Sequence, residues 1–280
     1  MRHIEGTFEG QGGLKLYRQA WLPEGEVKAI LTAVHGLAEH SGRYESFAEY
    51  FTSLGYAVYS YDHQGHGRSD GLRCYVDRFS VFIRDLDTFV KGIRTEYPDH
   101  KIFLVGHSMG GTLAASYCVG HQEKCDGLIL SAAALKLGSS VPAALRFIAP
   151  VLSFLIPKAG LYSIKSSDLS HSEDTKESYC SDPLVYNGKI PTRIGIELLR
   201  TIEGLPDHFS DIRLPLLILH GTDDRLSEPS GSKALYENAS SDDKVLKFYE
   251  GFYHELLNEN GREKVLLDVE EWLKKRIQRI

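Results

Sequence analysis

The feature that most restricts the fold of this chain is a serine between two glycines, directly after an apolar run. Residues 106–110 read Gly-His-Ser-Met-Gly, and the apolar segment 102–105 precedes them. A serine in a G-x-S-x-G segment that joins a strand to a helix lies on a sharp turn, which tolerates only small neighbours and exposes the hydroxyl above the sheet edge. The segment therefore predicts a strand, a nucleophilic Ser108, and a helix over residues 112–119 whose amide dipoles favour negative charge.

A serine hydroxyl needs a general base, and the base needs an acid that orients it. After this kind of turn the partners follow in the order acid, then histidine, each behind a strand. The apolar segment 214–221 is followed by Asp223 and Asp224, and the alternating segment 244–249 is followed by His254. We therefore predict His254 as the base, whereas spacing alone leaves both aspartates open as the acid.

Acyl transfer also needs N–H donors for the oxyanion of the tetrahedral intermediate. The amide that follows the serine, Met109 N–H, is one expected donor. The second is expected in the loop after an earlier strand, and the segment 28–34 followed by His35 and Gly36 fits this description. Because Gly36 allows the backbone to turn, Leu37 N–H is the second expected donor.

Five groups of residues, in order along nearly the whole chain, match the motifs of one known family. The first reads His-Gly-Leu-Ala-Glu-His-Ser-Gly-Arg-Tyr and the second contains a D-x-x-G-H-G-x-S-x-G turn. The matching residues are 35–44, 61–71, 106–111, 181–184, and 224–226 with 253–254. In them the chain resembles the monoacylglycerol lipases, which are serine α/β-hydrolases with lysophospholipase-like relatives. The resemblance implies an α/β-hydrolase fold: a mostly parallel central sheet, helices on both faces and an inserted helical cap.

The resemblance also implies an activity and assigns roles. It implies cleavage of monoacylglycerols to fatty acid and glycerol through an acyl-enzyme intermediate, with no cofactor and no metal. It favours Asp224 as the acid, and Leu37 and Met109 as the oxyanion donors. A lysophospholipase, a broad carboxylesterase and a hydrolase-fold receptor remain alternative interpretations.

The glycerol end of the substrate has its own expected residues. The resemblance implies that Glu39 and Arg43, with Tyr179 from the cap, surround it. The alternative for Glu39 and Arg43 is an ordinary i,i+4 ion pair on a helix surface. The chain departs from animal members at Leu257, where they carry a second histidine three residues after the catalytic one.

Other histidines carry weaker signals. His63 and His66 flank a glycine and suggest a metal pair, but no third ligand is in view, so we expect them to be structural. His107 and His220 are expected to pack beside the site. His40 is either an orienting residue or an exposed one, and the sequence leaves this open.

Composition narrows the range of partners. A net charge of −6 argues against nucleic acid, which requires a basic face. Four cysteines without metal-type spacing suit a reduced, cytoplasmic protein. The first residues form no signal peptide, and no apolar stretch is long enough to span a membrane. We expect a cytoplasmic enzyme with a small lipid substrate and transient contact with a membrane surface.

Alternating strands and helices predict a hydrolase core at residues 1–135 and 211–280, interrupted by a cap at 136–210. The first part of the cap, residues 141–157, is apolar and broken by three prolines. It fits short helices that pack on the core, a lid edge that touches lipid, or both. The polar segment 163–187 is expected to loop back across the site.

Overall fold

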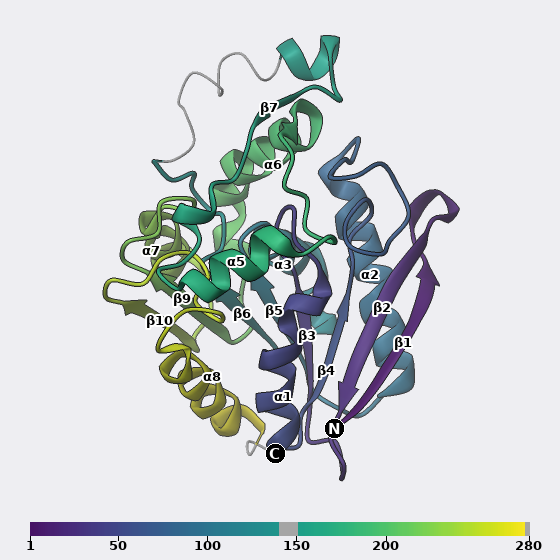
Figure 1. Cartoon of the computed structure of the whole chain (residues 1–280). Coiled ribbons are helices and arrows are strands. Elements are labelled where there is room, and N and C mark those ends of the chain that lie inside the picture. Colours follow the sequence, from purple (N-terminus) through teal and green to yellow (C-terminus); the bar gives the residue numbers. More distant parts are fainter. Residues whose placement is uncertain (140–150, 278–280) are drawn as a thin grey trace.

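The computed structural model describes residues 1–139 and 151–277, and a mixed sheet of eight strands forms its centre (Figure 1). The strands are β1 (Arg2–Glu9), β2 (Lys15–Leu22), β3 (Ile30–Val34), β4 (Ala57–Tyr61), β5 (Ile102–His107), β6 (Gly127–Ser131), β9 (Leu216–Gly221) and β10 (Lys244–Tyr249). Their order is β1-β2-β4-β3-β5-β6-β9-β10. The β1–β2 and β2–β4 pairs are antiparallel and every other pair is parallel. The predicted α/β-hydrolase fold is thereby confirmed.

Helices cover both faces of the sheet because successive strand residues point to opposite sides. In β5, for example, Ile102 and Leu104 belong to one apolar cluster, whereas Phe103 and Val105 belong to the other. The first cluster packs against α2, α3 and α7, and the second against α1 and α8. These helices are α1 (Glu45–Ser53), α2 (Phe79–Glu96), α3 (Met109–His121), α7 (Pro229–Asn238) and α8 (Arg262–Ile277).

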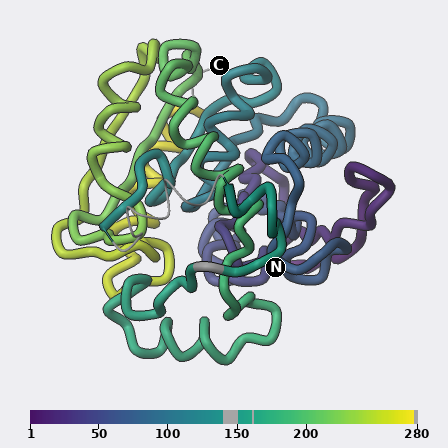
Figure 2. Tube along the Cα trace, turned by 90° about the horizontal axis from the view of Figure 1, so that it is seen from above, coloured from purple at the N-terminus to yellow at the C-terminus, as the bar shows by residue number. Residues whose placement is uncertain are grey.

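The insertion between β6 and β9 lies over the carboxyl ends of the parallel strands. Seen from above, its teal and green segments run across the middle of the molecule, between the purple N-terminal part and the yellow C-terminal part (Figure 2). It contains a helical stretch at residues 151–155, then β7 (Gly160–Tyr162), α5 (Glu173–Ser181), β8 (Ile190–Pro191), α6 (Thr192–Gly204) and the 3-10 helix η5 (Leu205–Asp211). Most of the apolar segment 141–157, including Phe147 and Ile148, lies outside the described residues.

One buried carboxylate fastens this insertion to the core. Glu259 accepts hydrogen bonds from Ser170 Oγ (3.0 Å) and from the backbone N–H groups of His171 (2.8 Å) and Asn260 (2.9 Å). Close by, the N–H of Glu255 donates to the carbonyl of Leu169 (2.9 Å). The cap segment 169–172 is therefore attached to the loop that follows β10.

No helix in the described part of the chain is both long enough and apolar enough to cross a bilayer.

Candidate active site

Ser108 lies on the turn between β5 and α3, with φ +51° and ψ −122°. A side chain is rarely found in this left-handed region, and such backbone persists only where the surrounding structure enforces it. Here the enforcement is close packing: a Cβ on Gly110 would lie 2.0 Å from the carbonyl oxygen of Val34, and one on Gly106 would lie 2.6 Å from that of Gly110. Any larger residue at these glycines would push the turn away from β3.

Asp224 and His254 meet although thirty residues separate them. Nδ1 of His254 lies 2.7 Å from Oδ2 of Asp224, and both side chains are buried. The other oxygen, Oδ1, accepts the N–H groups of Leu226 (2.8 Å) and Ser227 (3.0 Å), which fixes the plane of the carboxylate. Asp223 is exposed and accepts a hydrogen bond from the preceding threonine instead (3.0 Å).

Each member of this pair shifts the pKa of the other. Burial alone would lower the pKa of the His254 ring, but the Asp224 carboxylate, together with Glu255 and Glu39, outweighs it, so the pKa of His254 is raised. Burial would likewise raise the pKa of Asp224, yet His254 and His220 hold it below its usual range. His220 is buried as predicted, and its Nε2 also lies 3.2 Å from Asp224 Oδ2, a contact that we did not predict.

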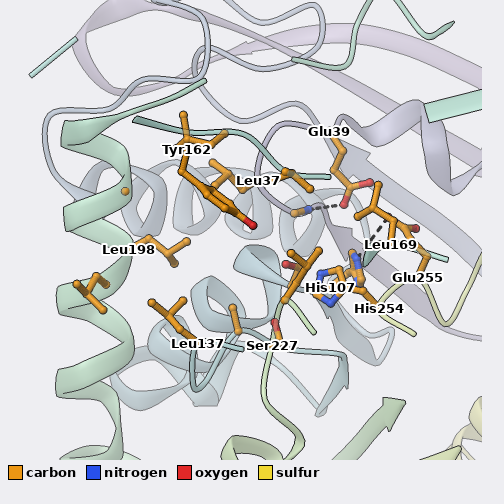
Figure 3. Close-up of a pocket in the computed structure, with 18 of the residues that line it drawn as sticks. Leu37, Glu39, His107, Leu137, Tyr162, Leu169, Leu198, Ser227, His254 and Glu255 are labelled. Carbon is orange, nitrogen blue, oxygen red and sulfur yellow. Dashed lines mark hydrogen bonds and ion pairs between the residues drawn. The ribbon is translucent and has the colours of Figure 1, made fainter. Parts of the chain in front are cut away.

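Ser108 and His254 line the same cavity, which has a volume of about 170 Å³ (Figure 3). Because Nδ1 of His254 is bonded to Asp224, Nε2 is the ring nitrogen left to accept a proton. Within residues 1–139 and 151–277, no hydrogen bond joins Ser108 Oγ to this ring. In ligand-free enzymes this bond is often long and shortens when substrate binds.

The two expected oxyanion donors belong to adjacent segments. A Cβ on Gly36 would lie 3.2 Å from Cβ of Ser108, so the loop after β3 touches Ser108. In the described part of the chain, the N–H groups of Leu37 and Met109 donate to no acceptor. Two unused N–H groups beside a serine are what an oxyanion hole needs.

A buried charge cluster forms one end of the cavity. Nη1 of Arg43 donates to Glu39 Oε2 (2.7 Å) and to Glu255 Oε1 (2.9 Å), and Glu39 Oε1 accepts Gly36 N–H (2.5 Å). The side chain of Arg43 is 10% exposed and both carboxylates are 4% exposed. Its guanidinium lies 4.9 Å from the ring centre of Tyr179. Glu39 and Arg43 thus form the i,i+4 pair considered above, but the pair is buried at the cavity wall.

Glu255 is the residue that sequence reasoning missed. Burial would raise its pKa, but Arg43 and then His107 lower it to about 2, so it is a carboxylate at neutral pH. The one feature of the sequence that could have pointed to Glu255 was its position directly after His254. The partner that gives it a role, Arg43, is 212 positions away in the chain.

The remaining histidines have structural roles. His40 is buried and bonds to Asp182 of the cap (2.8 Å), which resolves the question that the sequence left open. His107 Nδ1 bonds to the carbonyl of β6 residue Ser131 (3.0 Å). Burial lowers the pKa of His63 to about 3 and of His66 to about 4, so both rings are uncharged. Among the described residues, no group of three or more metal-binding side chains is present.

The opposite end of the cavity is apolar. In Figure 3, Leu198 and Leu137 lie on one side, whereas Glu39, Glu255 and His254 lie on the other. The apolar lining comes mainly from the insertion and from the loop after β9, through Leu137, Tyr162, Ile164, Leu198, Leu199 and Leu226. The cavity therefore suits a molecule with one hydrocarbon end and one polar end.

The sequence pattern of the serine aminopeptidase S33 family matches residues 25–261. The chain belongs to this family. It is 34% identical to a monoacylglycerol lipase from Mycolicibacterium smegmatis over 96% of both chains, and 37% identical to the human monoglyceride lipase over 88% of this chain and 82% of that one. Among solved structures, the monoacylglycerol lipase of Paleococcus ferrophilus superposes with a TM-score of 0.85 at 30% identity, over 93% of this chain and 99% of that one. These likenesses within the family confirm the resemblance that the motifs indicated.

Proposed function

We propose that this protein hydrolyses monoacylglycerols to fatty acid and glycerol. The observation that carries the proposal is the polarity of the cavity around Ser108, which is apolar at one end and charged at the other. An ester of one fatty acid and glycerol has the same two ends, with the scissile carbonyl between them. The names of the family members reported above support the same substrate.

In the mechanism that we propose, His254 Nε2 takes the proton of Ser108 as its Oγ attacks the ester carbonyl. The carbonyl oxygen becomes an oxyanion that accepts hydrogen bonds from Leu37 and Met109 N–H. The glycerol oxygen then leaves with the proton from His254, and an acyl-serine remains. Water repeats these steps and releases the fatty acid, while Asp224 holds the imidazole in the required tautomer and stabilises its protonated form.

Glu39, Arg43 and Tyr179 would surround the glycerol. Nη1 of Arg43 is used by the two carboxylates, whereas Nε and Nη2 have no acceptor among the described residues and the side chain lines the cavity. These N–H groups can donate to glycerol hydroxyls. Leu257, which stands where animal members have histidine, is buried in the same apolar cluster as the residues of α8. It therefore offers no polar group to the glycerol, and Glu255 is the polar side chain at the charged end of the cavity.

The family description suggests a second candidate, an aminopeptidase. An aminopeptidase must hold a free α-ammonium group, which requires an unpaired carboxylate near the serine. Both carboxylates at the polar end, Glu39 and Glu255, are paired with Arg43. Because Arg43 already pairs with both carboxylates, this end of the cavity suits an uncharged group such as glycerol better than an ammonium group.

Membrane contact through a cap at residues 136–210 is part of the proposal. The described helical stretch, residues 151–155, carries Phe154, which is 81% exposed, and Leu155, which is 66% exposed. Val151 and Ile156 beside them are also exposed. Neighbouring exposed apolar side chains of this kind favour a lipid surface, from which a monoacylglycerol enters the cavity.

The deciding experiment is a substrate panel with monooleoylglycerol, dioleoylglycerol, trioleoylglycerol, lysophosphatidylcholine and leucine p-nitroanilide. We expect the highest kcat/KM for monooleoylglycerol, no hydrolysis of the anilide, and loss of all turnover in Ser108→Ala. A higher kcat/KM for lysophosphatidylcholine than for monooleoylglycerol would indicate that the protein is a lysophospholipase instead. Binding of these lipids without turnover by the parent protein would indicate a receptor.

A further inference from the structure

A second cavity adjoins the apolar end of the first. It has a volume of about 420 Å³ and lies between the segment 135–137, α6, η5 and α7. Two residues belong to the lining of both cavities, Leu137 and Leu199. The same two side chains therefore form a wall of the cavity that contains Ser108 and a wall of its neighbour.

The second cavity has an apolar floor and a polar rim. Leu135, Ile202 and Phe209 form its floor and are buried in the main core cluster. Lys136 and Ser230 stand at the rim, where Lys136 Nζ bonds to Ser230 Oγ (3.0 Å). An apolar floor beneath a polar rim accepts hydrocarbon and leaves the charged groups in water.

We propose that the distal part of a long acyl chain passes between Leu137 and Leu199 and lies in this second cavity, so that the two leucines act as a chain-length gate. The inference rests on the proposed function, because the ester must lie at Ser108 with its glycerol beside Arg43. The acyl chain then points toward the side of the cavity on which Leu137 lies, away from Glu39 and Glu255 (Figure 3).

The gate consists of side chains that can move. Leu137 is only partly buried, and its segment is held through the backbone, where Gly138 N–H donates to the Leu226 carbonyl (2.8 Å). Leu199 lies on α6 and is buried. A rotamer change at the partly exposed Leu137 takes picoseconds to nanoseconds and would widen the passage without movement of the cap backbone.

The proposal predicts that kcat/KM depends differently on acyl-chain length for short chains and for chains that extend past the two leucines. Short acyl groups end inside the first cavity, and longer ones gain additional apolar contact only beyond the leucines. Each methylene that moves from water to an apolar wall changes kcat/KM by about fourfold. Filling the second cavity should therefore penalise long chains and leave the contacts of short ones unchanged.

Ala234→Trp tests this, because Ala234 lines the second cavity and not the first. The matched control is Lys233→Trp on the same helix, where the side chain is 64% exposed. The measurement is kcat/KM for p-nitrophenyl butyrate, octanoate and palmitate in the parent and both variants. We expect the palmitate-to-butyrate ratio to fall by about tenfold or more in Ala234→Trp and to stay at the parental value in Lys233→Trp.

An unchanged ratio in a folded Ala234→Trp variant overturns the inference, as does an equal fall in both variants. Should Ala234→Trp fail to fold by circular dichroism, Ser230→Trp at the exposed rim provides the same test with the same expected fall. The esters carry no glycerol, which separates this result from the proposed function. A shifted ratio in an enzyme that is inactive on monooleoylglycerol would support the acyl site and refute the assigned substrate.

Discussion

Asp224→Asn is the substitution whose effect follows most directly from the structure. Oδ1 of Asp224 faces two N–H donors, from Leu226 and Ser227, so the amide oxygen of asparagine would remain there. The amide NH₂ then occupies the position of Oδ2, which lies 2.7 Å from His254 Nδ1. Because NH₂ donates and does not accept, Nδ1 must become the acceptor and the ring proton moves to Nε2. In that tautomer the ring cannot take the proton of Ser108.

The expected loss of activity has two causes: the histidine adopts the wrong tautomer, and the imidazolium loses the buried negative charge beside it. A change of this kind costs about ten-thousand-fold in kcat, or roughly 5.4 kcal/mol of transition-state stabilisation. Asp223→Asn is the control, since its exposed side chain touches neither His254 nor His220. We expect it to retain activity within about twofold, in line with surface substitutions generally.

The assay is steady-state hydrolysis of p-nitrophenyl butyrate and of monooleoylglycerol, with circular dichroism to verify that both variants fold. Comparable losses in the two variants would mean that the acid has been assigned to the wrong aspartate. A loss below about tenfold in a folded Asp224→Asn variant would mean that the 2.7 Å contact does not control the histidine.

Three further predictions concern the base, the charge cluster and the cap. Because the pKa of His254 is raised and only the neutral ring accepts a proton, the acid limb of the kcat/KM profile should lie above pH 6.5; a midpoint below this value would contradict it. Glu255→Gln removes a buried carboxylate that accepts from Arg43, which keeps its bond to Glu39, and should lower the free energy of unfolding in urea by about 2 kcal/mol, against no more than ~0.5 kcal/mol for exposed Glu250→Gln. Replacing Phe154 and Leu155 with serine should slow hydrolysis of vesicle-bound monooleoylglycerol but not of p-nitrophenyl butyrate, and equal effects would exclude a role in lipid contact.

The sequence predicts the core of the fold well, because its strands and helices carry clear apolar patterns. The segments after β5, β9 and β10 are predicted to carry the site because the carboxyl ends of parallel strands meet at one edge. The helix after the serine was expected from residue 112, whereas α3 begins at Met109, directly on the turn. Patterns of neighbouring residues determine strands and helices of this kind, so they can be predicted from the sequence.

Contacts between distant segments were harder to predict. Spacing did not distinguish Asp224 from Asp223, because the choice depends on how a tight turn orients two adjacent side chains. The role of Glu255 depends on Arg43, and no local pattern links them. In the cap, α6 buries Ile194, among other residues, but no helix over this segment was predicted from the sequence.

From the attachment made by Glu259 we expect that the cap does not move as one piece. The amides of His171 and Asn260 are held by a carboxylate from the loop that also carries His254. Hydrogen–deuterium exchange at those amides would thus report on the integrity of the reaction centre, even though neither touches a reacting atom. If those amides stay protected while the cap opens, the motion must take place beyond residue 172 or before residue 169. The loop that carries His254 would then stay in place while other parts of the cap move.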